Sequence, residues 1–177
     1  RVFKDGSQYG VEVDRWPYET ESAETAFARC FTHPLNGPAV SDPRRPTYKE
    51  NVYSFQYGSV KIIVFNNNYW ASNQSKLYGG SPEGYLMDDQ LKWIATELES
   101  AEAAPSVRYV FLIAQEPVFP NGGHLKDGMW YFGDNSVRAR VFTDGKLVPE
   151  KEGIVEVRNR FVTLVSRHRK VAAVLGA

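Results

Sequence analysis

The chain has 177 residues, which corresponds to one domain of ordinary size or to a large piece of one. Its 21 basic and 21 acidic residues cancel, so there is no overall basic field of the kind that collects nucleic acid. With 42% hydrophobic residues the chain can bury a core, but its longest apolar runs fall far short of the roughly 18 residues needed to cross a bilayer. We therefore expect a globular protein with no nucleic-acid partner and no membrane span.

Residues 1–50 are rich in glycine and proline, and this composition predicts irregular structure. One helix is predicted there, over residues 21–31, because apolar side chains recur at the spacing of a helix face. Those side chains belong to Ala23, Ala26, Phe27 and Cys30. Cys30 is the single cysteine, so the chain cannot form an internal disulfide.

From residue 51 the pattern changes to a layer of strands and helices. Residues 51–66 alternate and then become apolar, which predicts a β-hairpin that turns at Gly58 and Ser59, with its second strand buried on both faces. Residues 66–84 have the polar composition of a surface loop. A helix is predicted over residues 88–103, because Met87, Leu91 and Ile94 begin one apolar stripe, and a strand over residues 108–114.

The rest of the chain is predicted as a long loop over residues 115–151, a helix over 153–169 and a strand over 170–175. The order of hairpin, helix, strand, loop, helix and strand is typical of an α/β protein in which helices cover a mixed sheet. We therefore interpret residues 1–177 as a single domain.

The loop after the strand at 108–114 is the place where we expect chemistry, because functional loops follow buried strands. Two prolines stiffen it, Gly122 and Gly123 leave room for a ligand beside the backbone, and His124 can change protonation near neutral pH. A purely structural turn is the alternative for this loop. His33 and His168 are interpreted as structural, and the three histidines match no local metal-ligand spacing.

Further candidates for binding a substrate follow in the same segment. Asn121 and Asp127 offer polar groups beside aromatic side chains that can line a pocket. Arg138 offers a guanidinium, which matches the geometry of a phosphate, although a solvated arginine is the simpler interpretation. No P-loop, dinucleotide-binding or nucleophile-elbow motif occurs. The glycosylation sequon at Asn73 slightly favours an extracellular or periplasmic location.

Three segments, in order, resemble the calcineurin-like metallophosphoesterases, the superfamily that includes the purple acid phosphatases. Residues 51–66, NVYSFQYGSVKIIVFN, resemble the hairpin that this family writes as Y-S-F-D-Y-G-N-V-H-F-I-V-L-N. Residues 89–98 resemble the family helix Q-L-x-W-L-x-x-x-L, and residues 110–117 resemble the strand that leads to its histidine-proline motif. The resemblance covers residues 51–177, and residues 1–50 only by position.

The resemblance implies a four-layer α/β/β/α sandwich and a hydrolase in which two divalent ions, zinc, iron or manganese, activate a water for attack on a phosphate ester. The family motifs D-x-H, G-D-x-x-D and G-N-H-E are absent from this sequence. We therefore expect the chain to be the C-terminal half of such a domain. A missing N-terminal half, or another chain, would cover its exposed strands, and the chain alone would bind no metal tightly.

Two residues take family roles by position. Gln115 stands where the family places the metal-ligating histidine of H-x-P, and an amide oxygen is a poorer ligand than imidazole for zinc or iron. His124 falls where the purple acid phosphatases place a histidine that contacts the phosphate and protonates the leaving group. The alternative is a non-catalytic structural or binding protein that retains the fold, which Gln115 and the missing ligand motifs favour.

Overall fold

The computed structural model describes residues 23–40, 44–72, 75–123, 125–126 and 128–176. Its centre is a four-stranded mixed sheet in the order β1-β2-β3-β6. The strands are β1 (Tyr53–Tyr57), β2 (Val60–Val64), β3 (Tyr109–Ala114) and β6 (Val171–Gly176). β1 and β2 form an antiparallel hairpin, and β2, β3 and β6 run parallel. The predicted α/β class and mixed sheet are therefore confirmed.

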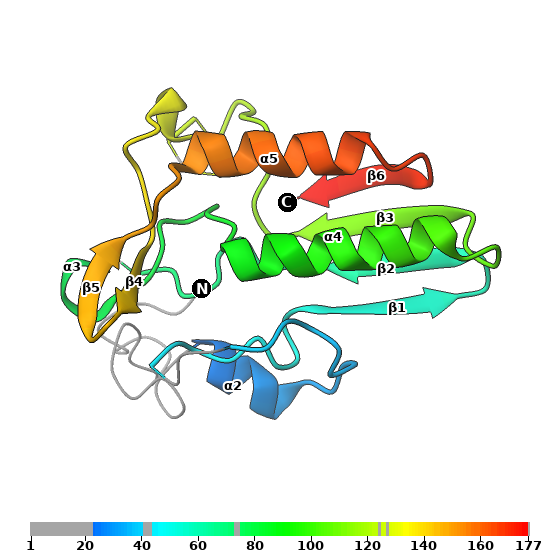
Figure 1. Ribbon diagram of the computed structural model, residues 1–177, viewed down its shortest axis with the longest axis horizontal. Helices are drawn as coiled ribbons and strands as arrows, with labels where there is room; N and C mark the ends of the chain where they lie inside the picture. Colours follow the sequence, from blue (N-terminus) through cyan, green and yellow to red (C-terminus); the bar gives the residue numbers. More distant parts are fainter. Residues whose placement is uncertain (1–22, 41–43, 73–74, 124, 127, 177) are drawn as a thin grey trace.

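Two long helices, α4 (Asp88–Ala103) and α5 (Ile154–Ser166), lie side by side on one face of this sheet (Figure 1). The core lies between them and the sheet, where Ile63 and Leu112 meet Ile94 and Phe161, all of them almost fully buried. α4 has the predicted bounds because its apolar stripe repeats at helical spacing until Pro105. Its C-terminal end is held by Lys170, whose ammonium donates to three carbonyls of residues 101–104 at 2.8 to 2.9 Å.

Smaller elements surround the sheet. They are α2 (Ala23–Cys30), α3 (Ser75–Tyr78), the 3₁₀ helix η1 (Tyr131–Gly133), and the strands β4 (Arg140–Thr143) and β5 (Lys146–Pro149). β4 and β5 form a second, antiparallel sheet, so the prediction of one long loop over 115–151 was wrong at this point. The turn at Asp144 and Gly145, both with positive φ, joins the two strands.

The structure also differs from the prediction at the face of the sheet opposite the helices, where the second hairpin strand was expected to be buried. The register places eleven apolar or aromatic side chains on this open face. They are Tyr53, Phe55, Tyr57, Val60, Ile62, Val64, Tyr109, Phe111, Ile113, Ala173 and Leu175. None of them is buried, and Tyr57 is 84% exposed. The prediction that the second hairpin strand is buried on both faces was therefore wrong, since Val60, Ile62 and Val64 on the open face are only partly buried.

The outer edge of β1 is held by a single side chain. Asn36 accepts a hydrogen bond from the Ser54 amide at 3.0 Å and donates to the Ser54 carbonyl at 2.9 Å. Trp93 of α4 in turn donates to the carbonyl of Asn36 at 2.7 Å. The segment before β1 is thereby fixed to both the sheet and the helix layer.

Candidate functional site

The carboxyl ends of the three parallel strands point to the same side of the molecule, toward α3 and the β4–β5 hairpin (Figure 1). In open α/β sheets ligands bind beyond these ends. β2 is followed by residues 66–68, a run of three asparagines, and β3 is followed by Gln115 and Glu116. β6 ends beside them, since a Cβ on Gly176 would lie 3.1 Å from the carbonyl oxygen of Glu116. This edge is the candidate site.

Two asparagines fix the chain immediately after β3. Asn67 is completely buried, and its amide group donates to the Glu116 carbonyl at 2.9 Å and accepts from the Glu116 amide at 3.1 Å. Asn68 donates to the Glu116 carboxylate at 2.8 Å and accepts from the Gly84 amide at 2.9 Å. The backbone beside Gln115 is therefore held in one position, while Gln115 itself is exposed.

The segment over residues 66–84 is a structural support of this edge, and the prediction of a surface loop was wrong. Tyr69, Trp70 and Ser81 are buried, together with Asn67. Gln90 of α4 is also buried, and its amide bonds both the backbone amide and the carbonyl of Asn66 at 3.0 and 2.9 Å. These polar side chains are satisfied inside the protein, which is why they can be buried.

The loop after β3 packs tightly against this support at two glycines. A Cβ on Gly84, whose φ is +78°, would lie 1.8 Å from the carbonyl oxygen of Gly128. The Met129 amide donates to the Pro117 carbonyl at 3.2 Å, and the Met129 side chain is fully buried. Further on, Asn135 accepts from the Glu156 amide at 3.0 Å in the first turn of α5. The loop is thus anchored to the rest of the fold at several points.

The tip of this loop is open. Asn121 is exposed, and its side-chain oxygen accepts from the Gly123 amide at 3.3 Å. A Cβ on Gly122 or Gly123 would have no atom within 4 Å, so a ligand has space beside this backbone. His124 and Asp127 lie outside the described residues.

Arg138 lies at the start of the β4–β5 hairpin. Its Nη1 group donates to the carbonyls of Glu150, at 3.3 Å, and Lys151. The side chain therefore holds the two ends of the hairpin region together. No described contact brings it to Gln115 or Asn121.

The described residues do not by themselves fit a pair of metal ions. Among them no group of three or more histidine, cysteine, aspartate or glutamate side chains comes together. Gln115 offers one amide oxygen at the edge of the sheet, a ligand suited to hard cations. A metal pair at this edge would need ligands from residues outside that part of the chain.

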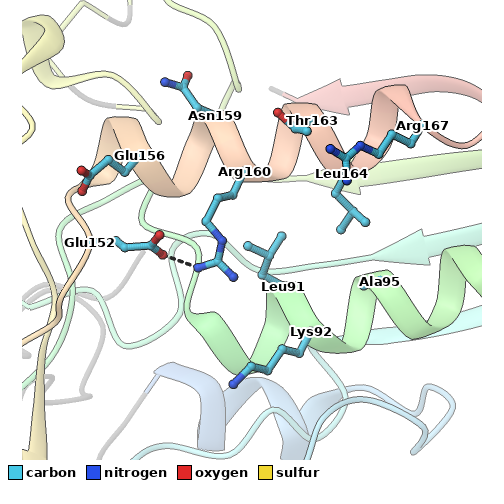
Figure 2. A pocket seen from close by; sticks show the side chains of 10 residues that line it. All are labelled: Leu91, Lys92, Ala95, Glu152, Glu156, Asn159, Arg160, Thr163, Leu164 and Arg167. Atoms are coloured by element: carbon cyan, nitrogen blue, oxygen red, sulfur yellow. Dashed lines mark hydrogen bonds and ion pairs between the residues drawn. The ribbon is translucent and has the colours of Figure 1, made fainter.

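A concave surface lies between α4 and α5 (Figure 2). This groove of about 570 Å³ has Leu91 and Leu164 on its two sides. Arg160 crosses it and pairs with Glu152 and, at 3.0 Å, with Asp88. Burial opposes the charged form of Asp88, yet the hydrogen bonds from its cationic neighbours outweigh it and lower the pKa of this carboxyl. The Arg160 guanidinium and the carboxylates of Glu152 and Asp88 are therefore paired with one another.

Comparison with known proteins gives no match. No family model, no curated protein sequence and no solved structure is similar to the chain at a significant level. Within the described ranges, none of the helices combines the length and apolar character needed to pass through a membrane.

Proposed function

We propose that the chain is part of a metal-dependent phosphoesterase of the calcineurin-like superfamily. The observation that carries the proposal is the carboxyl edge of the parallel strands. There β3, the last of the three segments of the sequence resemblance, leads to an open loop that begins at Gln115. The asparagine contacts to Glu116 keep the start of this loop fixed, as a site that positions a phosphate ester requires.

In this proposal Gln115 is a metal ligand, Asn121 and Asp127 bind the substrate, and His124 supplies a proton to the leaving group. Arg138, a further substrate-binding candidate, supports the proposal less, because its guanidinium already bonds two main-chain carbonyls. The remaining metal ligands would come from outside this sequence. The metal content of the complete protein, measured together with its hydrolysis of an aryl phosphate, tests the proposal.

The role of Gln115 can be tested separately in the complete protein. Gln115→Ala should lower the metal content, while Gln56→Ala, at an exposed position of β1, should leave it unchanged. A complete protein that holds no metal and hydrolyses no phosphate ester would favour the alternative, a non-catalytic structural or binding protein. The observation that favours this alternative is the amide of Gln115 in place of an imidazole.

The open face supports a further part of the proposal, namely that the complete domain is a four-layer α/β/β/α sandwich. Two sheets that pack face to face lie about 10 Å apart and bury their inner apolar side chains between them. The eleven side chains of the open face have the composition of such an inner face. We infer that a second sheet, from the complete protein or from another chain, covers it.

The isolated chain is expected to retain no metal pair, because the described residues supply too few ligands. Elemental analysis after exposure to zinc, iron and manganese salts, followed by gel filtration, measures this. Hydrolysis of a generic aryl phosphate should also be negligible. Stoichiometric retention of two metal ions by the chain alone would show that the ligands are misplaced in the proposal.

The isolated chain is also expected to associate and to bind a hydrophobic dye, because its open face exposes contiguous apolar surface. Light scattering coupled to gel filtration measures the association. Replacing Tyr57 and Tyr109 together with lysine should reduce both effects. Leu77→Lys, at a 69% exposed position on α3, is the matched control and should change neither. A monodisperse monomer that binds no dye would contradict the expectation.

A further inference from the structure

Arg158 of α5 is a buried cation at the boundary between the helix layer and the loop that follows β3. Only 9% of its surface is exposed. Its guanidinium lies 4.8 Å from the ring centroid of Trp130 and 5.7 Å from that of Phe119. Both aromatic residues belong to the loop that carries Asn121. The side chain therefore faces the loop that follows β3.

Hydrogen bonds to the described residues use two of the five N–H groups of Arg158. Nε and Nη2 donate to the side-chain oxygen of Asn159 at 3.2 and 2.9 Å. A guanidinium carries five N–H groups, so three remain, two on Nη1 and one on Nη2. One N–H of Nη1 and one of Nη2 form the end of the fork that can bind an oxyanion with two parallel hydrogen bonds.

No carboxylate of the described residues pairs with Arg158, which distinguishes this buried arginine from Arg160 and Arg45. Arg160 pairs with Glu152 and Asp88, and Arg45 pairs with Asp89 at 2.9 Å. A buried charge is costly unless it is paired, and aromatic contacts compensate only in part. Burial accordingly lowers the pKa of Arg158, although an arginine side chain stays charged in proteins.

We propose that Arg158 is an oxyanion-binding residue of the candidate site and that its ligand is a phosphate group held by Nη1 and Nη2. The choice of phosphate among oxyanions rests on the proposed function. Trp130 and Phe119 orient the guanidinium. Gly122 and Gly123 belong to the same loop, and a Cβ on either would meet no atom within 4 Å, so this loop leaves space beside its backbone. Arg158 thereby supplies the cationic contact that Arg138, bound to main-chain carbonyls, does not.

The test uses the chain with a chelator present, so that no metal contributes. Inorganic phosphate is titrated at constant ionic strength, and binding is followed by calorimetry and by tryptophan fluorescence. We expect saturable binding that Arg158→Gln weakens about tenfold or more, as for a hydrogen bond to a charged group. Arg167→Gln, at an exposed arginine after the C-terminal end of α5 with no ion pair to a described residue, is the control and should bind like the unmodified chain.

Two further measurements separate binding from folding. Circular dichroism shows whether Arg158→Gln is folded, and Arg158→Lys keeps the charge but loses the fork, so its affinity should be intermediate. In the unmodified chain, the side-chain N–H signals of Arg158 in NMR spectra should shift with phosphate saturation. Absence of binding, equal binding by folded Arg158→Gln, or equal affinity for sulfate would overturn the proposal.

The outcome is independent of the metal chemistry. A complete protein without metal and without hydrolysis would contradict the proposed function. Phosphate binding that depends on Arg158 would still stand in that case. Conversely, an active metalloenzyme whose phosphate binding is unaffected by Arg158→Gln would overturn this inference alone.

Discussion

Replacing His124 with alanine in the complete protein is expected to lower kcat by roughly 10² to 10⁴, the usual size of a general acid-base contribution, with unchanged metal content. In the proposed function His124 donates a proton to the departing alkoxide. An activated leaving group needs little protonation, so the loss should be smaller with a nitrophenyl ester than with an alkyl phosphate. Steady-state kinetics on both esters measures the difference.

The other two histidines are the controls. The His33 ring stacks on Tyr53 with centroids 4.3 Å apart, and Nδ1 of His168 lies 2.9 Å from the carbonyl oxygen of Leu164. Both rings have structural contacts, and alanine at either position should leave kcat close to its original value. Equal loss on both esters after His124→Ala would instead indicate binding or folding. No loss on either would remove His124 from the mechanism.

The largest expected effect on stability comes from Gly84→Ala. The new methyl group would meet the Gly128 carbonyl at 1.8 Å, and the backbone φ of +78° disfavours any residue with a Cβ. Overpacking and backbone strain each cost about 1 to 3 kcal/mol, so the free energy of unfolding should fall by about 2 to 6 kcal/mol. Urea unfolding followed by circular dichroism measures this change.

Gly122→Ala is the matched control, because a Cβ at that position meets no atom within 4 Å. Its effect on the free energy of unfolding should stay within about 0.5 kcal/mol. If the two substitutions had equal effects, the close contact between residues 84 and 128 would not exist in solution. Loss of stability at Gly84 alone would support the packing of the loop against residues 66–84.

Periodic segments of the fold could be predicted from the sequence because their side chains repeat at one spacing. α4 is the best example, with its stripe from Met87 to Leu98 and Pro105 beyond its end. The β4–β5 hairpin escaped prediction because its apolar residues are adjacent pairs, Val141 with Phe142 and Leu147 with Val148, and do not alternate. The Asp-Gly pair between them was the available signal.

The candidate site was only partly predictable. The position of the loop after β3 follows from the general location of ligand sites in α/β sheets, and Gln115 stands there. The burial of Asn67 could not be predicted, because asparagine is usually a surface residue and its hydrogen-bond partner Glu116 is 49 positions away in the sequence. Arg158 was missed for the same reason, since only the fold brings it to Trp130.

Because Asn36 bonds to Ser54, further strands can be added to the sheet at only one of its two edges. An additional strand beside β1 would need the outward backbone groups of Ser54, and the Asn36 amide already occupies both. A strand from another molecule is therefore blocked from pairing with β1 at Ser54, and it can be added to this sheet only beside β6, the other edge strand. Filaments that grow by edge-to-edge pairing need two free edges, so pairing through the β6 edge of this sheet should stop at two copies and not continue into a filament.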